Sequence, residues 1–316
     1  MSYGLADGTR IRAVEGLDFV CSDGETVGIL GESGCGKSTL AHAILRLLPP
    51  RARFEHGTIL FRGDDLVTMP ETGLRELRGR HIALVPQDPA LSLNPVITVG
   101  TQVEEVLRAH LSLRDKQRRA RVLELLAEVG FDHPQSIYGA YPHQLSGGQR
   151  QRITIAQAIA CNPALIIADE PTSKLDAPLQ AEIFALLAQV RRKHGIAMLA
   201  ISHDPTLFAG FADRIAVMYA GSVIETGSAS QILGESLHPY TRALLGIAKS
   251  ALIAPSAGSR SRLTAIEGEP PNPVAFPQGC RFHPRCPDRM ELCSQRFPPA
   301  FLPSLSRPVH CFKYEG

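Results

Sequence analysis

The stretch Thr26–Leu30 (TVGIL), followed directly by Gly31–Thr39 (GESGCGKST) and then by LAHAILRLL, decides the fold of this chain. The first segment is short, apolar and rich in β-branched residues, which predicts a buried strand. The third segment has apolar residues at helical spacing. The loop between them matches G-x-x-x-x-G-K-[ST], which binds phosphate where it joins a strand to a helix. The sequence therefore predicts an α/β domain with a phosphate-binding loop.

This loop contains the residue types that a nucleoside triphosphate requires. Its glycines let backbone N–H groups turn toward phosphate, and the positive end of the following helix adds to the attraction. Lys37 can reach the β- and γ-phosphates, and the Ser38 hydroxyl can ligate Mg²⁺. The candidate nucleotide-binding residues of the loop are Gly31, Ser33, Gly34, Gly36, Lys37, Ser38 and Thr39.

A second apolar run, residues 164–168 (ALIIA), ends in Asp169 and Glu170. An isolated Asp-Glu pair is usually part of a solvated loop. Here the preceding strand and the phosphate-binding loop favour a functional pair, because ligands of open α/β sheets bind at the carboxyl ends of the strands. We expect Asp169 to hold Mg²⁺ and Glu170 to polarise an attacking water.

The composition excludes several classes of protein. Hydrophobic residues make up 44% of the 316, which rules out a chain dominated by disorder. The net charge of +2 is too small to indicate nucleic-acid binding. No apolar stretch approaches the roughly 18 residues that a membrane span needs, and residues 1–10 lack a signal-peptide core. We therefore expect a soluble, cytosolic chain unless a partner recruits it.

The segment Leu145–Arg152 (LSGGQRQR) resembles the signature sequence of the ATP-binding-cassette (ABC) ATPases. Gln87 in VPQDP and His203 in ISHD are similar to that family's Q-loop glutamine and switch histidine. The resemblance implies an ABC-type P-loop NTPase over residues 1–235, with a core sheet covered by helices, an antiparallel β subdomain and a helical subdomain at about 91–160.

The resemblance also implies roles for these residues. Glu170, His203 and Gln87 would be catalytic, and Ser38, Gln87 and Asp169 would hold Mg²⁺. The signature motif, which opens a helix, would close on the γ-phosphate bound by the opposite subunit, so that ATP joins two cassettes. Its candidate ATP-binding residues are Ser146, Gly148 and Gln149. The segment LNPVITVG after Gln87 would face a membrane partner.

Two features depart from the family pattern. Lys174, in the D-loop segment Ser173–Asp176, stands where relatives usually have a small residue. It is either a tolerated surface lysine or the mark of a degenerate site beside a different partner cassette. The second departure is at the N-terminus, where relatives begin with an extra strand and an aromatic residue stacks on adenine. Only Tyr3 is near that place.

The last part of the chain has a different composition. Residues 251–316 hold 11 of the 24 prolines, and four of the seven cysteines follow residue 279. The run SALIAPSAGSRSR predicts a flexible joint. A hairpin is predicted at residues 214–227, with its turn at Ala220 and Gly221. Residues 236–316, with HPYTRALLG and the cysteine-rich end, resemble the C-terminal extension of the oligopeptide, dipeptide and nickel importer ATPases.

The four late cysteines suggest a metal centre, because disulfides are disfavoured in a cytosolic ATPase. Their spacing of five, six and seventeen residues does not match the close pairs of structural zinc sites. Four thiolates suit zinc or an iron–sulfur cluster, and the resemblance favours [4Fe–4S]. Four unligated thiols are the alternative. The candidate ligands are Cys280, Cys286, Cys293 and Cys311, with His283 and His310 as substitutes that are more often bystanders.

The resulting prediction is the ATP-hydrolysing subunit of an importer for dipeptides, oligopeptides or similar small solutes, with nickel as another cargo. Its partners would be two transmembrane permease subunits, a second cassette of the same or a related chain, and an extracytoplasmic solute-binding protein, with no nucleic acid. It would lie peripherally on the cytoplasmic face of the inner membrane. The alternatives are a soluble ABC ATPase of the repair or translation type and a regulatory module without turnover. Glu170 and His203 argue against the latter.

Overall fold

The structure is a computed structural model of the chain, and it describes residues 1–4, 8–252, 266–303 and 307–315. Most of the predicted joint at residues 250–262 lies outside this part. The chain divides into two compact units. The first unit contains Met1–Val20, Val27–Thr58 and Ser202–Gly316; the second contains Cys21–Thr26 and Ile59–Ile201.

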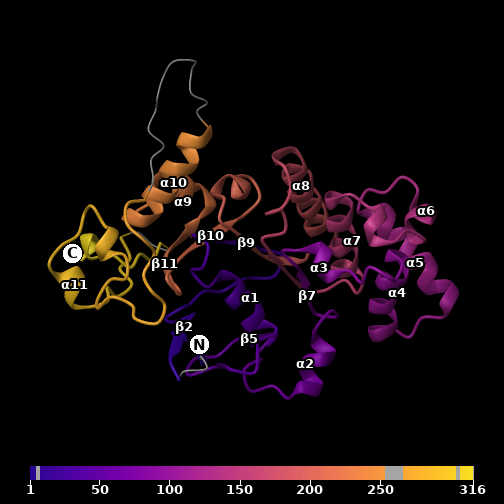
Figure 1. Cartoon of the computed structure of the whole chain (residues 1–316), viewed down its shortest axis with the longest axis horizontal. Helices are drawn as coiled ribbons and strands as arrows, with labels where there is room; N and C mark the ends of the chain where they lie inside the picture. The colour runs from indigo at the N-terminus through magenta and orange to yellow at the C-terminus, as the bar shows by residue number, and fades with distance from the viewer. Residues whose placement is uncertain (5–7, 253–265, 304–306, 316) are drawn as a thin grey trace. The chain divides into compact units, whose positions relative to one another are not determined.

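The core strands of the first unit are built around the predicted buried strand. β3 (Thr26–Leu30) is buried along its whole length and pairs in parallel with β10 (Arg214–Tyr219). β11 (Ser222–Ser228) returns antiparallel to β10, and Figure 1 labels both strands. The strand order is therefore β11-β10-β3. The turn between β10 and β11 has φ values of 47° at Ala220 and 85° at Gly221. The predicted hairpin and its turn are therefore confirmed.

A small antiparallel sheet and one helix complete the N-terminal part of this unit. β1 (Ser2–Gly4) lies between β2 (Arg10–Arg12) and β4 (Ala52–Arg53), as expected for the antiparallel β subdomain. The predicted helix after the phosphate-binding loop is α1 (Lys37–Ile44), which buries Leu40, Ala41 and Ile44.

Within the predicted extension, residues 236–316, the part that the structure describes has only short regular elements after its first helix. Two helices continue from β11: α9 (Ala229–Glu235) and α10 (Pro239–Leu252). The other elements of the unit are short, namely η2 (Pro205–Phe208), η3 (His283–Arg285), α11 (Leu292–Gln295) and η4 (Phe312–Tyr314).

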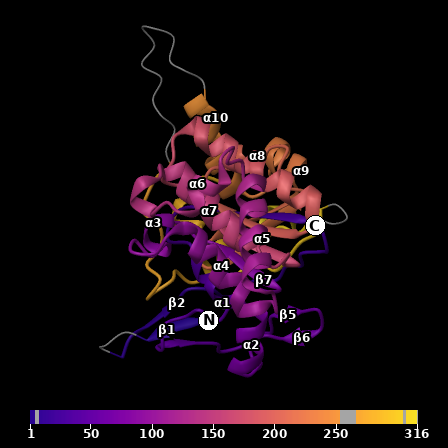
Figure 2. The same ribbon diagram turned by 90° about the vertical axis from the view of Figure 1, so that its right-hand side faces the viewer.

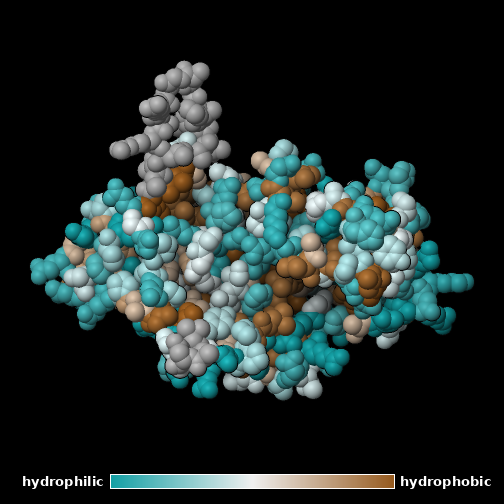
Figure 3. Space-filling model, viewed as in Figure 1, coloured by the Kyte–Doolittle hydropathy of each residue, from teal (hydrophilic) through white to brown (hydrophobic). Residues whose placement is uncertain are grey.

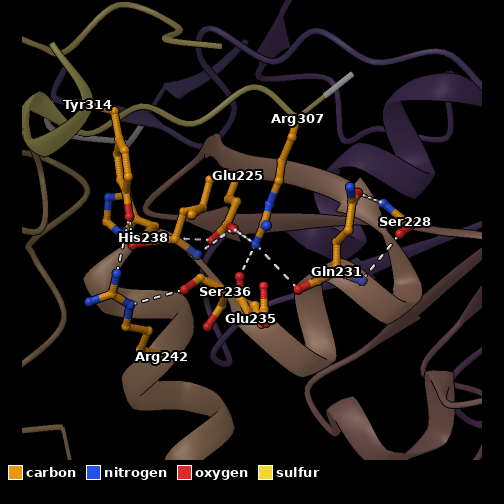
Figure 4. A network of polar contacts seen from close by, with 10 residues as sticks. Glu225, Ser228, Gln231, Glu235, Ser236, His238, Arg242, Arg307 and Tyr314 are labelled. Carbon is orange, nitrogen blue, oxygen red and sulfur yellow. Dashed lines mark hydrogen bonds and ion pairs between the residues drawn. The ribbon is translucent and has the colours of Figure 1, made fainter. Parts of the chain in front are cut away.

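A buried polar network holds the end of the extension against β11 and α9 (Figure 4). The Glu225 carboxylate is fully buried and accepts from the backbone N–H groups of Leu237 and His238, at 2.7 and 3.0 Å. Arg307 donates to the same carboxylate and to the backbone oxygens of Gln231 and Glu235. A buried charge of this kind is tolerated because it is paired and hydrogen-bonded.

His238 in this region predicts a pH dependence of stability. Burial, with the nearby charges of His310 and Arg242, lowers its pKa from 6.5 to about 3, and its Nδ1 accepts from the Tyr240 N–H at 3.0 Å. Between these pH values the unfolded chain binds a proton that the folded chain does not. The free energy of unfolding should therefore fall as the pH drops below about 6.5, by up to about 1.4 kcal/mol per pH unit.

Urea unfolding of the full-length chain at pH values from 7.5 to 5 measures this slope. His238→Asn, which keeps an acceptor but does not titrate, should flatten it. His133→Gln, at an exposed position, serves as the control and should leave it unchanged. Equal slopes in all three proteins would contradict the assignment of this dependence to His238.

The second unit contains three parallel core strands, β7 (Ile82–Val85), β8 (Leu165–Asp169) and β9 (Ala197–Ser202), in the order β9-β8-β7. Its helix α8 (Ala177–His194) is N-capped by Asp176 and ends at Gly195 in a left-handed conformation. The smaller elements are β5 (Leu60–Phe61), β6 (Asp64–Asp65), α2 (Glu71–Leu77) and α3 (Pro89–Ser92).

A helical layer in this unit falls within the range predicted for the helical subdomain (Figure 2). Its buried apolar positions include Val103, Leu107 and Leu125. The helices are α4 (Val99–His110), α5 (Asp115–Glu128), α6 (Pro134–Tyr138), η1 (Pro142–Gln144) and α7 (Gly147–Ile159). The predicted α/β class is confirmed, whereas the domain boundaries at 91, 160 and 235 stay predictions.

The surface in Figure 3 is mostly hydrophilic, with scattered apolar patches. Among the residues that the structure describes, no helix combines the length and apolarity that crossing a membrane requires.

Candidate nucleotide-binding and catalytic site

The phosphate-binding loop joins β3 to α1 in the first unit. A Cβ at Gly31 would lie 2.2 Å from the Met218 oxygen, and one at Gly36 would lie 2.4 Å from the Ala13 oxygen. Gly34 and Gly36 also have φ values of 81° and 104°, which side chains rarely adopt. These positions therefore require glycine, as the motif predicts.

Lys37 is buried beneath this loop, with 4% of its surface exposed. Its Nζ donates to the backbone oxygens of Gly31 and Glu32 at 2.8 and 2.9 Å. Ser33 and Gly34 are exposed at the tip, and Ser38 follows Lys37 in the first turn of α1. An exposed glycine-rich tip, a buried lysine and a hydroxyl at the start of a helix fit the phosphates and Mg²⁺ of Mg-ATP.

Tyr3 lies on β1, and its hydroxyl donates to Thr39 Oγ1 at 3.3 Å. This places Tyr3 beside α1. Its proposed stacking on adenine stays a prediction.

The two carboxylates stand at the end of β8 in the second unit. Asp169 is buried, whereas Glu170 is partly exposed and has φ 44°, an unusual value for a residue with a side chain. The Glu170 N–H donates to the Ile201 oxygen of β9 at 3.0 Å, and its own oxygen accepts from the Ser173 N–H at 3.2 Å. These bonds hold the backbone in its strained conformation and aim the carboxylate out of the strand.

Gln87 and Glu170 are brought together by neighbouring strands. β7 and β8 pair in parallel, and both residues follow the carboxyl ends of these strands. Gln87 Nε2 donates to Glu170 Oε2 at 3.2 Å. Two residues predicted to be catalytic, 83 positions apart in the sequence, therefore share a direct hydrogen bond.

The signature motif forms the start of α7. The Ser146 hydroxyl accepts from the Gln149 N–H at 3.2 Å, and the Gln149 side chain accepts from the Ser146 N–H at 2.9 Å. This reciprocal capping fixes the first turn of the helix. Gly148 is buried, and a Cβ there would lie 3.3 Å from Leu179. Ser146 and Gly147 stay exposed, so the positive end of this long helix faces outward.

Lys174 has a partner within its own chain. Its Nζ forms an ion pair with the carboxylate of Asp88, the residue after Gln87, and this bond lowers the pKa of Asp88. Asp88 also caps α3 by accepting from the Ala90 N–H at 2.9 Å. The ion pair gives the lysine a local role beside the Q-loop. Whether it marks a degenerate site stays a prediction.

His203 follows β9 and is exposed. It belongs to the first unit with the phosphate-binding loop, whereas Gln87, Glu170 and the signature motif belong to the second. The assignment of all these residues to one nucleotide site therefore stays a prediction.

The four late cysteines line one small cavity of about 10 Å³ in the first unit. This is room for about one water molecule, far less than a [4Fe–4S] cluster needs. Burial raises the pKa of Cys280 and Cys286 to about 11, so both are thiols in the metal-free chain. The described residues contain no group of three or more His, Cys, Asp or Glu side chains placed to hold a metal ion. The structure therefore does not support the predicted iron–sulfur centre on Cys280, Cys286, Cys293 and Cys311.

The sequence analysis did not predict two ion pairs between distant residues. The Asp88–Lys174 pair joins positions 86 apart, and Glu32 in the phosphate-binding loop pairs with Arg285, which is 253 positions away. No spacing rule connects residues so distant, and the only signal was an arginine among the late cysteines.

Comparison with known families agrees with this geometry. Residues 14–173, which include the phosphate-binding loop, Gln87, the signature motif and the Asp169-Glu170 pair, match the family described as ABC transporter. The chain belongs to the ABC transporter family. It is thus an ABC ATPase, and ATP is its cofactor. Residues 224–293 match a second family, described as the C-terminal region of oligopeptide/dipeptide transporters.

Individual proteins are similar over most of the chain. The dipeptide transport ATP-binding protein DppD of Bacillus subtilis is 42% identical over 96% of this chain and 90% of its own length. The corresponding protein of Haemophilus influenzae is 43% identical, covering 91% of this chain and 86% of its own length. A putative peptide import ATP-binding protein of Brucella abortus is 45% identical, over 89% and 83%.

Solved ABC cassettes share the fold. A dimeric structure of the cassette MJ0796 in a post-hydrolysis state, bound to ADP and Pi, has a TM-score of 0.64 and 30% identity, covering 72% of this chain and 95% of that one. The structure of cbiO1 from Clostridium perfringens has a TM-score of 0.63 and 30% identity, covering 81% and 93%.

Proposed function

We propose that this chain is the ATP-hydrolysing subunit of an importer for dipeptides, oligopeptides or similar small solutes. The observation that carries the chemistry is the hydrogen bond between Gln87 and Glu170 at the ends of two parallel core strands. The cargo class is supported by the match of residues 224–293 to the oligopeptide/dipeptide transporter region and by the peptide transport proteins above.

In this proposal each part of the site has a separate task. Lys37 and the N–H groups of its loop hold the β- and γ-phosphates, while Ser38, Gln87 and Asp169 hold Mg²⁺ directly or through water. Glu170 polarises the attacking water, and its contact with Gln87 links that step to the Q-loop. His203 contacts the γ-phosphate.

The signature motif acts on a second cassette. Its exposed helix start is suited to the γ-phosphate bound by the opposite subunit, with Ser146, Gly148 and Gln149 as the contributing residues. The ATPase region would span 1–235, with the helical subdomain at 91–160, and the extension would span 236–316.

The proposed partners are two permease subunits, a second cassette and an extracytoplasmic solute-binding protein, and the chain would lie on the cytoplasmic face of the inner membrane. An exposed apolar pair beside the Q-loop supports the permease contact, since 86% of Leu91 and 78% of Val96 are accessible. The transport proteins among its relatives favour this function over a soluble repair or translation factor.

Reconstitution tests the proposal. The chain is purified in detergent with its co-expressed permeases and partner cassette, placed in proteoliposomes, and supplied with ATP, the binding protein and labelled di- and oligopeptides. We expect ATP-dependent peptide uptake, and none when the complex carries Glu170→Gln. An active ATPase that associates with no membrane protein would contradict the importer assignment.

A further inference from the structure

Residues of the C-terminal extension form hydrogen bonds with one residue of the phosphate-binding loop, Glu32. The guanidinium of Arg285 donates to both carboxylate oxygens of Glu32, at 2.8 and 3.2 Å. The Glu32 N–H donates to the hydroxyl of Tyr240 on α10, at 2.9 Å. The side chain and the backbone of one loop residue are thus both held from the extension, and all three residues belong to the first unit.

This ion pair is shielded from water. The Arg285 side chain is 5% exposed and that of Glu32 is 25% exposed. Arg285 also donates to the backbone oxygens of Ile266 and Glu267 and to the Tyr219 hydroxyl, which lies 3.4 Å away. A two-pronged (bidentate) arginine–carboxylate contact in a largely buried environment is strong and geometrically specific. Removing either partner leaves the charge of the other without an opposite charge to compensate it.

The position of Arg285 is fixed by an aromatic cluster from three parts of the chain. Tyr219 of β10, Tyr240 of α10 and Phe282 of the extension pack together, with ring centroids 4.5 to 5.4 Å apart. Arg281, one turn before Arg285, forms an ion pair with Glu15 and donates to Ser222 Oγ at 3.1 Å. The segment that carries Arg285 is therefore docked rigidly on the core.

Glu32 in turn contacts the lysine of the motif. Its backbone oxygen accepts from Lys37 Nζ at 2.9 Å and from the Cys35 N–H at 3.3 Å. A shift of Glu32 would move the oxygen against which the lysine rests. Its carboxylate would also repel the phosphates that the loop binds unless a cation neutralised it. Arg285 supplies that cation.

We propose that Arg285 and Tyr240 are positioning residues for ATP binding: through Glu32 they hold the phosphate-binding loop in shape and cancel a negative charge beside the triphosphate. This inference rests on the proposed nucleotide-binding role of the loop. It gives the extension a role in the ATPase reaction, although the extension lies far from the phosphate-binding loop in the sequence.

The test measures ATP affinity of the full-length chain by calorimetry and the ATP KM and kcat of the assembled complex. Arg285→Gln should raise the KM about tenfold, because a charge-assisted contact is lost and the Glu32 carboxylate is unmasked, while kcat changes much less. Added salt should shrink this defect, since it screens the repulsion. Glu32→Gln with Arg285→Gln should bind ATP more tightly than Arg285→Gln alone, because no carboxylate remains.

Arg289→Gln, at an exposed position four residues further on, is the matched control and should match the wild type. Tyr240→Phe should raise the KM a few-fold. An ATP affinity of folded Arg285→Gln within twofold of the wild type, or a double variant with simply additive losses, would overturn the inference. Should Arg285→Gln fail to fold, Arg285→Lys replaces it, because it keeps the charge and loses only the two-pronged geometry; an unchanged KM in both Arg285→Lys and Tyr240→Phe would overturn the positioning role. Lys37→Ala is measured in parallel: if it still binds ATP, the site assignment itself fails.

Discussion

Glu170→Gln is expected to bind ATP normally and to hydrolyse it at least about a hundredfold more slowly, because only the step that needs a positioned, polarised water is lost. The amide has nearly the same shape as the carboxylate and can still accept the hydrogen bond from Gln87, which is 3.2 Å long in the wild type. It cannot take up a proton. The defect should therefore appear in kcat and not in the affinity for ATP.

Single-turnover hydrolysis and equilibrium ATP binding, both in the complex with permease and partner cassette, separate these quantities. The Glu170→Gln protein should also accumulate with bound ATP as a closed dimer of cassettes. Cross-linking or a measurement of molecular size would detect this dimer. Glu124→Gln, on the exposed face of α5, controls for loss of a surface carboxylate. Near-normal turnover in Glu170→Gln would remove Glu170 from the catalytic assignment.

Lys37→Ala should lower ATP affinity at least about a hundredfold, since two charge-assisted contacts to phosphate are lost together. The change also removes the lysine donor from the backbone oxygens of Gly31 and Glu32. The loop should lose its shape as well as its charge.

Calorimetry with the full-length chain measures this loss directly. Lys116→Ala removes an exposed lysine from α5 and should leave ATP affinity unchanged, which controls for the change in net charge. A Lys37→Ala protein that binds ATP within threefold of the wild type would show that the nucleotide is held elsewhere.

The local parts of the site were predictable because each is encoded by a short, continuous motif. The run TVGIL with its glycine loop predicted β3, the loop and α1, and the glycines stand where side chains would collide with backbone oxygens. Gln87 was assigned only through the family resemblance, and its contact with Glu170 was not predicted. The structure explains this contact, since both residues follow the carboxyl ends of neighbouring parallel strands.

The contacts between distant segments were not predictable. The two-pronged contact of Arg285 with Glu32 depends on how the extension folds back over the core. Arg285 belongs to no motif, and Glu32 occupies a position of the phosphate-binding loop at which the motif specifies no residue. The cysteines show the opposite case. Their number suggested a ligand set, yet their side chains converge on a cavity with room for about one water, and packing decides what thiols can hold.

The outer edge of β11 shows a further consequence of the extension. β11 is an edge strand of its sheet, and an edge strand presents unpaired backbone N–H and C=O groups with which a strand of another chain can pair. Residues 308–310 occupy this edge: the Thr226 N–H donates to the Pro308 oxygen at 3.0 Å, and the His310 N–H donates to the Ile224 oxygen at 2.8 Å. Pro308 itself has no N–H to offer a further strand. Residues 308–310 thus cover an edge that would otherwise be open to strand pairing, which is one way in which proteins limit edge-to-edge aggregation, although this segment contributes nothing to the nucleotide motifs.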